Sequence, residues 1–276
     1  MSIPTFTGTE SPSTIALKLH TLGQGSVRFI PQHVPGIALI ILDNARRHNA
    51  FSGKMMVEFR DIILQLEREP PDDLVGLIVT GCRGKAFCSV FVRDYGSGPG
   101  VSEAISRLMH DTLTRLARLS LITVASMAGP ALGAGTELLT AFDFVCMNAS
   151  THLRFIQTRR GITSPWGGLR RLVNRVGRKN ALLIMGSAPR MSATDGQRFG
   201  LVDCVVPCKD DEGAYDACLS AATDFLQPFV LGDDKQDRVS VHAVRGMKEL
   251  VVRADLDADS QYEMKLFAKT VGSSKL

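Results

Sequence analysis

The chain has 276 residues, 45% of them hydrophobic and 22% charged, with a formal net charge of +4. This composition is typical of a globular protein and excludes a collagen, a coiled coil and a disordered chain. The six cysteines are too widely spread for the disulfide framework of a small secreted domain, and the mild charge gives no indication of nucleic-acid binding.

The N-terminal part begins with a polar segment and continues as strand, helix and strand. Residues 1–23 are rich in Ser, Thr, Pro and Gly and lack a secretory signal, so we expect a flexible arm with at most one short strand. Residues 37–42 are a β-prone apolar run. Apolar residues then recur every three or four positions, which predicts a helix that Ser52 opens and Pro70 ends. Residues 75–80 form the next buried strand.

The middle of the chain contains an uncharged run whose length approaches that of a membrane span. Residues 87–92 are strand-like, and Ser102 is expected to cap the helix that follows. Residues 119–136 carry no charge, but Pro130 and three glycines interrupt them. We therefore predict a buried strand at 122–126 followed by a turn and a helix, and no membrane span.

Strands and helices continue to alternate in the remaining sequence. Further strands are predicted at 144–147, 153–156 and 201–206, and helices at 136–142, 169–176 and 179–185. The alternation predicts the α/β class, with parallel strands, helix-covered faces and a loosely recurring strand–strand–helix unit. We divide the chain into an N-terminal arm (1–23), a core domain (24–213) and a helical C-terminal region (214–276) that serves oligomerisation.

Metal and dinucleotide chemistry find no support in the sequence. Cys204 and Cys208 lack the second pair of ligands that a zinc site needs, so no metal site is predicted. The glycines of 129–135 have the wrong spacing for a dinucleotide loop. Two turns remain, 85–91 and 129–137, each after a predicted strand. Their backbone N–H groups would bind a developing oxyanion if they converged, and two tight packing turns are an equal alternative.

Four motifs occur in order: RHNAFS at 47–52, KAFCS at 85–89, GAGTEL at 133–138 and GITSPWGG at 161–168. On these motifs the chain resembles the enoyl-CoA hydratase/isomerase (crotonase) superfamily over about 37–206. The resemblance implies a crotonase-like spiral of ββα units with a helical C-terminal region, assembled as a homotrimer or hexamer. It also implies an acyl-CoA substrate, with coenzyme A as part of that substrate and no covalently bound cofactor.

The resemblance assigns roles to individual residues in catalysis. The thioester oxygen would lie between the backbone amides of Phe91 and Ala134, and Glu137 would donate a proton. A carboxylate that only stabilises the start of its helix is an equal alternative for Glu137. Hydratases of the family use a second carboxylate, and that position falls near Gln157, which cannot act as an acid or base at neutral pH.

Further residues are expected to bind the two ends of the substrate. The resemblance and charge matching place Arg46, Arg47 and Lys85 at the phosphates of coenzyme A, with Ala50 and Ala86 along the rest of it. The acyl pocket would be lined by Gln157, Ser164, Pro165 and Trp166.

Three functions are open at this point. The first is decarboxylation of a short carboxyacyl-CoA of the ethylmalonyl-CoA or methylmalonyl-CoA type, which needs only one acid. The second is an enoyl-CoA hydratase or isomerase of peroxisomal fatty-acid oxidation. The third is a non-catalytic CoA-binding homologue, because Val90 and Val92 replace a glycine and an acidic residue of the family pattern. The C-terminal Ser274-Lys275-Leu276 predicts import into peroxisomes by the receptor for that signal.

Overall fold

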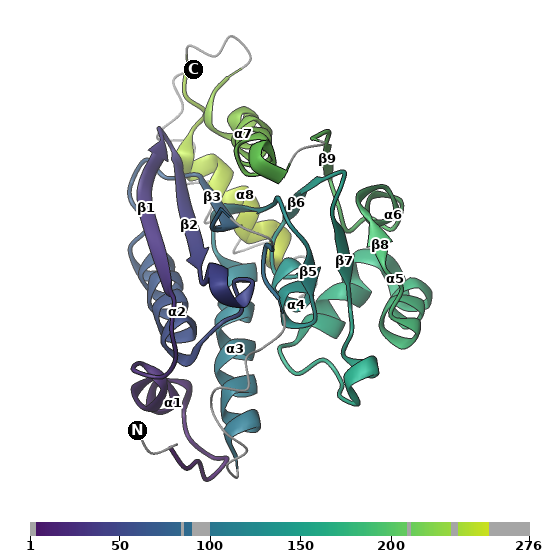
Figure 1. Ribbon diagram of the computed structural model, residues 1–276. Helices are drawn as coiled ribbons and strands as arrows, with labels where there is room; N and C mark the ends of the chain where they lie inside the picture. Colours follow the sequence, from purple (N-terminus) through teal and green to yellow (C-terminus); the bar gives the residue numbers. More distant parts are fainter. Residues whose placement is uncertain (1–3, 84–85, 90–99, 209–210, 233–236, 254–276) are drawn as a thin grey trace.

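The computed structural model describes residues 4–83, 86–89, 100–208, 211–232 and 237–253 (Figure 1). Its main sheet has six strands in the order β1-β2-β3-β4-β6-β9, and a smaller sheet has the order β5-β7-β8. The strands are β1 (Ser26–Val34), β2 (Ile37–Asp43), β3 (Gly76–Gly81), β4 (Ile122–Met127), β5 (Ala131–Leu132), β6 (Phe144–Asn148), β7 (His152–Arg154), β8 (Met191–Ser192) and β9 (Cys204–Val206).

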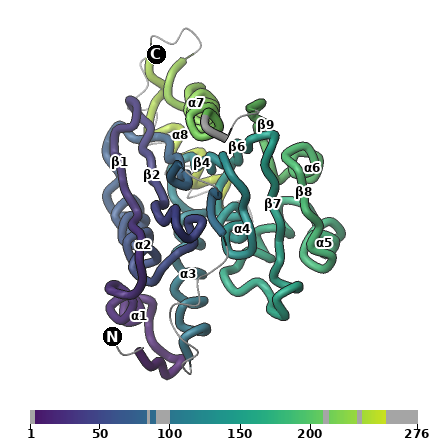
Figure 2. Tube along the Cα trace, viewed as in Figure 1, coloured from purple at the N-terminus to yellow at the C-terminus, as the bar shows by residue number. Residues whose placement is uncertain are grey.

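Helices cover both faces of the main sheet and extend beside the smaller one (Figures 1 and 2). The α-helices are α1 (Pro12–Leu19), α2 (Gly53–Arg68), α3 (Val101–Arg118), α4 (Ala134–Leu139), α5 (Gly168–Ser187), α6 (Ala193–Arg198), α7 (Asp211–Val230) and α8 (Val241–Arg253). Two short 3₁₀ turns, η1 (Ala45–Arg47) and η2 (Thr158–Arg160), lie in the connections. None of the helices in the described part of the chain is long and apolar enough to span a bilayer.

The main sheet separates two hydrophobic cores. Along β2, Ala38, Ile40 and Leu42 face the core formed with α1, α2 and α3, while the alternate residues face a second core formed with α7. Because β2 is buried on both faces, neither face carries the polar side chains that solvent contact would favour. Its sequence is therefore a continuous apolar run. Strands β2, β3, β4, β6 and β9 are parallel, as predicted, and only β1 joins this sheet antiparallel.

The prediction for the N-terminus is wrong over residues 12–19. These residues form α1, in which Ile15 and Leu19 are buried. Ser11 caps the helix by accepting a hydrogen bond from the Thr14 N–H, and Pro12 occupies the first turn. The Ser and Pro that suggested a flexible arm are therefore a helix-start signal.

Two other differences lie in the first half of the chain. Strand β1 was not predicted, because its partly exposed residues follow no clear alternation. Helix α3 begins at Val101 with Gly100 as its N-cap, so the prediction that Ser102 caps it is wrong. Gly100 has φ 75° and its Cα lies against the backbone of Phe6, which leaves no room for a side chain.

The C-terminal region is helical where it is described. Helices α7 and α8 confirm the expected pattern, and the chain between them contains a bridge of Leu231 with Arg238. Residues 254–276, including Ser274, Lys275 and Leu276, lie outside the described residues. Peroxisomal import and the oligomeric state therefore stay predictions, as do the domain boundaries.

The two predicted turns meet in space. Phe87 donates its backbone N–H to Pro130 O at 3.0 Å, and Leu132 donates to Cys88 O at 3.2 Å. Gly135 lies so close to the first turn that a Cβ atom added to it would be 2.1 Å from Cys88 O. A glycine at this position is thus required for the two turns to pack together.

We predict that Gly135→Ala lowers the free energy of unfolding by about 1–3 kcal/mol, because the added methyl group forces the turns apart. Denaturant unfolding measures the change. Gly186→Ala is the matched control, since nothing lies within 4 Å of its added Cβ and alanine favours a helix. Equal stability of Gly135→Ala and the wild type would contradict the close contact.

Candidate active site

The second turn presents a free backbone donor at the start of α4. Gly133 precedes the helix with φ 56° and ψ −113°, a conformation that only glycine adopts readily. Ala134 is the first residue of α4 and is half-buried, and its N–H has no acceptor within the described part of the chain. Because the first amides of a helix are unpaired and positively polarised, this N–H is suited to hold an oxyanion.

The loop after β2 is locked to the first turn by a buried asparagine. His48 and Asn49 both have positive φ, 53° and 55°. Asn49 donates from Nδ2 to Ala86 O at 2.8 Å and accepts at Oδ1 from the Asn44 N–H at 3.0 Å. These bonds tie the segment of Ala50 to that of Ala86, and both alanines are buried. The two predicted coenzyme A residues are therefore brought together.

Of the other residues predicted to bind coenzyme A or the oxyanion, some lie within the described part of the chain and some lie outside it. Arg46 and Arg47 lie exposed on η1, and neither makes an ion pair with the residues that the structure describes. Lys85 and Phe91 lie outside the described residues, as do Val90 and Val92. Of the two predicted oxyanion donors, the structure thus describes only Ala134.

Glu137 lines a cavity and accepts hydrogen bonds from four groups. Its side chain projects from α4 and is buried, with 2% of the residue exposed. Its Oε2 accepts hydrogen bonds from Ser164 Oγ at 2.7 Å, from the Trp166 N–H at 2.9 Å and from the Gly168 N–H at 3.2 Å. Its Oε1 accepts from Gln157 Nε2 at 3.1 Å. The donors, which lie 20 to 31 positions from Glu137 in sequence, converge on this carboxylate.

Gln157 lies beside Glu137 and has one unused acceptor. Its Nε2 also donates to Gly133 O at 3.2 Å, which connects it to the turn before α4. Its Oε1 is buried and has no hydrogen-bond partner among the described residues. A buried carbonyl oxygen without a donor is rare and marks a position where a proton or a ligand donor can be accepted.

Three of the four predicted acyl-pocket residues line a common cavity, and Ser164 is not among the residues that line it. Trp166 is buried and packs edge-on against Phe51, with ring centroids 6.3 Å apart. Pro165 is exposed beside it, and Ser164 also accepts from the Leu169 N–H at 3.0 Å. Gln157, Pro165 and Trp166 line a cavity of about 250 Å³ between α3, α4 and the segment 156–166.

The cavity is mainly apolar, with a few polar groups at defined places. Ile105, Ile156 and Ile162 contribute to its walls together with Trp166, and Ala134 and Glu137 lie at its α4 side.

Cys88, in the first turn, is buried, and burial raises the pKa of its thiol to about 12. It therefore stays protonated and is no nucleophile.

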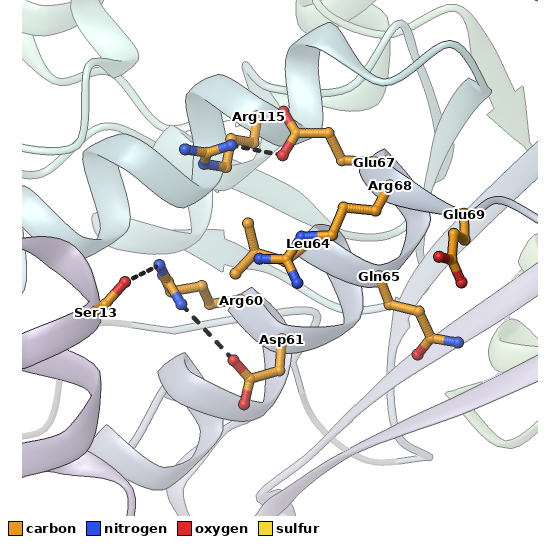
Figure 3. Close-up of a pocket in the computed structure, with 9 residues that line it drawn as sticks. All are labelled: Ser13, Arg60, Asp61, Leu64, Gln65, Glu67, Arg68, Glu69 and Arg115. Carbon is orange, nitrogen blue, oxygen red and sulfur yellow. Dashed lines mark hydrogen bonds and ion pairs between the residues drawn. The ribbon is translucent and has the colours of Figure 1, made fainter.

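A larger cavity of about 660 Å³ lies among α1, α2 and α3 (Figure 3). It contains none of the motif residues, and several of its charged side chains pair with each other. Arg115 contacts Glu67 at 2.5 Å, and Arg60 donates to Ser13 at 3.1 Å. We assign no chemistry to it. Within the described residues no cluster of His, Cys, Asp or Glu is suited to hold a metal ion.

Sequence reasoning missed a half-buried arginine that donates hydrogen bonds to the segment beside Glu137. Arg171 on α5 donates to Trp166 O at 2.8 Å and to Thr140 Oγ1 at 3.1 Å. Burial lowers its pKa to about 10, while the negative charge of Glu137 acts in the opposite direction. No local signal identifies Arg171, because its acceptors come from other segments of the chain.

Comparison with known proteins gives consistent results. A family model described as enoyl-CoA hydratase/isomerase matches residues 32–224. The Bos taurus protein named ethylmalonyl-CoA decarboxylase is 33% identical over 245 residues, 88% of this chain and 78% of that protein. The Xenopus laevis protein of the same name is 38% identical over 206 residues, 71% of this chain and 64% of its own length.

Solved structures are similar in fold. An enoyl-CoA hydratase from Bacillus anthracis superposes with a TM-score of 0.73 at 24% identity, covering 92% of each chain. A putative enoyl-CoA hydratase from Thermobifida fusca in complex with CoA has a TM-score of 0.70 at 21% identity, covering 96% of this chain and 97% of that one. These likenesses confirm the predicted fold.

We predict that Ser164→Ala lowers the free energy of unfolding by about 1.5–3 kcal/mol, because it removes a hydrogen bond to a buried carboxylate. Denaturant unfolding at neutral pH measures the loss. Thr163→Ala, at an exposed neighbouring hydroxyl, is the control and should stay within about 0.5 kcal/mol of the wild type. The same stability for both variants would show that the Ser164 bond contributes nothing.

Proposed function

The chain is an enzyme of the enoyl-CoA hydratase/isomerase (crotonase) family, and we propose that it decarboxylates a short carboxyacyl-CoA thioester of the ethylmalonyl-CoA or methylmalonyl-CoA type. Support comes from the relatives named ethylmalonyl-CoA decarboxylase, which are 33–38% identical to this chain. The small, mostly apolar cavity suits a short acyl group.

One observation carries the proposal: the partner of Glu137 in the cavity is an amide. Adding water across a double bond requires one group that removes a proton from water and one that delivers a proton to carbon. Gln157 lies 3.1 Å from Glu137 and does neither at neutral pH. Decarboxylation needs a single proton donor, and among the described residues that line the cavity Glu137 is the one carboxyl group.

The reaction can be written with these groups. The thioester oxygen accepts a hydrogen bond from the Ala134 N–H, which withdraws charge from the carbonyl. The bond between the α-carbon and the carboxylate breaks, its electron pair forms the enolate, and CO₂ leaves. A proton from Glu137 then reaches the α-carbon and gives the shorter acyl-CoA. The apolar walls weaken solvation of the carboxylate and so favour its loss.

Gln157 allows Glu137 to carry that proton while buried. With Glu137 ionised, the Gln157 amide donates from Nε2 to Oε1. With Glu137 protonated on Oε1, rotation of the amide brings Gln157 Oε1, which has no partner in the described chain, into position to accept the O–H. The Gln157 amide can therefore form a hydrogen bond with Glu137 in either charge state.

Coenzyme A would enter as part of the substrate. The Thermobifida fusca structures contain CoA and acetoacetyl-CoA, which supports a thioester ligand here. The exposed Arg46 and Arg47 next to the Ala50 segment suit its phosphates. We also propose the homotrimer or hexamer; exposed Leu182 on α5 and Val251 on α8 supply apolar surface for it.

We predict that the purified protein releases CO₂ from ethylmalonyl-CoA or methylmalonyl-CoA and leaves the double bond of an enoyl-CoA intact. Glu137→Gln should lower CO₂ release by about 10²–10³-fold, because it removes the proton donor while keeping the side-chain shape. Absorbance of the enoyl thioester and ¹⁴C release measure the two reactions. Glu69→Gln, at an exposed carboxylate on the far end of α2, is the control.

Each result has a distinct meaning. Absence of CO₂ from every carboxylated thioester, with an intact fold, would refute the proposed reaction. Undiminished release by Glu137→Gln would assign the proton to another group and leave the reaction class standing.

We further predict that Gln157→Glu introduces hydration of an enoyl-CoA, about 10²-fold above the wild-type background, since it supplies the missing second carboxylate next to Glu137. Loss of enoyl absorbance measures it. Gln65→Glu, at an exposed site on α2, controls for the added charge. A folded Gln157→Glu variant without hydration would remove the argument that the amide decides between the two reactions.

A further inference from the structure

Arg154, Arg159 and Arg160 differ in the acceptors that their guanidinium groups contact. Arg154 donates from Nε to Ala188 O at 2.8 Å, and Arg159 donates from Nη2 to Ser187 O at 2.9 Å. Both therefore bind the carbonyl end of α5. Arg160, next to Arg159, has no side-chain acceptor within the described part of the chain and lines the cavity instead.

Arg160 is the only cation among the described residues that line this cavity. The one carboxylate there is that of Glu137, whose two oxygens already accept four hydrogen bonds from other groups. Arg160 lines the cavity and is exposed, whereas Glu137 is buried. The cavity thus combines an apolar interior with one unpaired positive charge at its margin.

The position of Arg160 is fixed relative to the catalytic pair. It ends η2, and its backbone N–H donates to Gln157 O at 2.9 Å. Gly161 then reverses the chain with φ 71° and donates to Thr158 O at 3.1 Å. The same turn therefore places Gln157 beside Glu137 and Arg160 at the cavity margin.

We propose that Arg160 is the residue that selects acyl groups bearing a free carboxylate, by pairing its guanidinium with that carboxylate as the thioester enters. This inference rests on the proposed decarboxylation and names how its substrate class is recognised. A guanidinium matches a carboxylate with two parallel hydrogen bonds. A neutral acyl-CoA of the same length offers it no partner.

Pairing with Arg160 is an interaction of the bound substrate, which disappears as CO₂ leaves. It therefore strengthens binding of the carboxylated thioester without lowering the barrier to carbon–carbon cleavage. Because Arg160 is exposed, the pair is weakened by solvent, and a preference of about fivefold to tenfold is expected. Removing the charge should raise KM and leave kcat unchanged or higher.

The test uses two CoA thioethers that cannot form an enolate: S-(2-carboxybutyl)-CoA and S-butyl-CoA, which differ only in the carboxylate. Calorimetry gives the dissociation constant of each. We expect the wild type to bind the carboxylated thioether about fivefold to tenfold more tightly. Arg160→Leu should reduce that preference to below about twofold and leave S-butyl-CoA binding unchanged.

Arg159→Leu is the matched control, because it removes the same charge from the same turn at a side chain directed to α5. It should keep the wild-type preference. Arg160→Gln tests the same point if Arg160→Leu folds poorly, and Arg160→Lys should retain part of the preference. A preference that survives in Arg160→Leu and Arg160→Gln, or that is absent in the wild type, overturns the proposal.

Turnover separates this inference from the proposed function. If the wild type releases CO₂ but Arg160→Leu shows an unchanged KM, the role of Arg160 is wrong and the reaction stands. If the wild type releases no CO₂ but prefers the carboxylated thioether through Arg160, the selection stands and the reaction is wrong.

Discussion

The arrangement of the site depends on the hydrogen bonds that the buried carboxylate of Glu137 accepts. An ionised group removed from water is costly unless hydrogen bonds replace its hydration. Here Ser164, Trp166 and Gly168 supply three donors to one oxygen and Gln157 supplies one to the other. The segment that carries these donors must therefore fold across α4, and in doing so it forms a wall of the cavity.

The hydrogen bonds to Glu137 also require that neighbouring segments approach α4 closely, which only glycine allows at two positions. A Cβ on Gly168 would lie 2.6 Å from Glu137 Cγ, and one on Gly135 would overlap Cys88 O. At the other end of α4, Arg171 donates to Thr140 Oγ1 at 3.1 Å and Arg175 donates to Leu139 O at 3.4 Å. Helix α4 is thereby held at both ends, and Ala134 at its start lines the cavity.

Sequence patterns predicted the helices that bury one face and the strands that are buried on both faces. Helix α2 and strand β2 follow their hydrophobic periods, and the two helices expected around residue 177 correspond to α5, where Gly177 interrupts the helical backbone with φ 75°. Strand β1 is too polar for such a pattern. The candidate roles of Glu137 and Gln157 came from the family resemblance, whereas the hydrogen bonds of Ser164, Trp166 and Gly168 to Glu137 were not predicted. Arg160 and Arg171 escaped prediction because their roles depend on groups brought together only by the fold.

The polarity of the cavity changes from its margin to its interior in a way that suits loss of CO₂. A cation placed deep in an apolar cavity would form a strong ion pair with the substrate carboxylate and oppose its departure. An exposed cation such as Arg160 would form a weaker pair, which in our proposal is sufficient to favour a carboxylated acyl group on entry. In the proposed reaction, Ile105 and Ile156 would offer the substrate carboxylate no hydrogen bonds, whereas the Ala134 N–H would stabilise the charge of the enolate. Recognition of the leaving group and stabilisation of the product charge are thus separated in space, so one does not weaken the other.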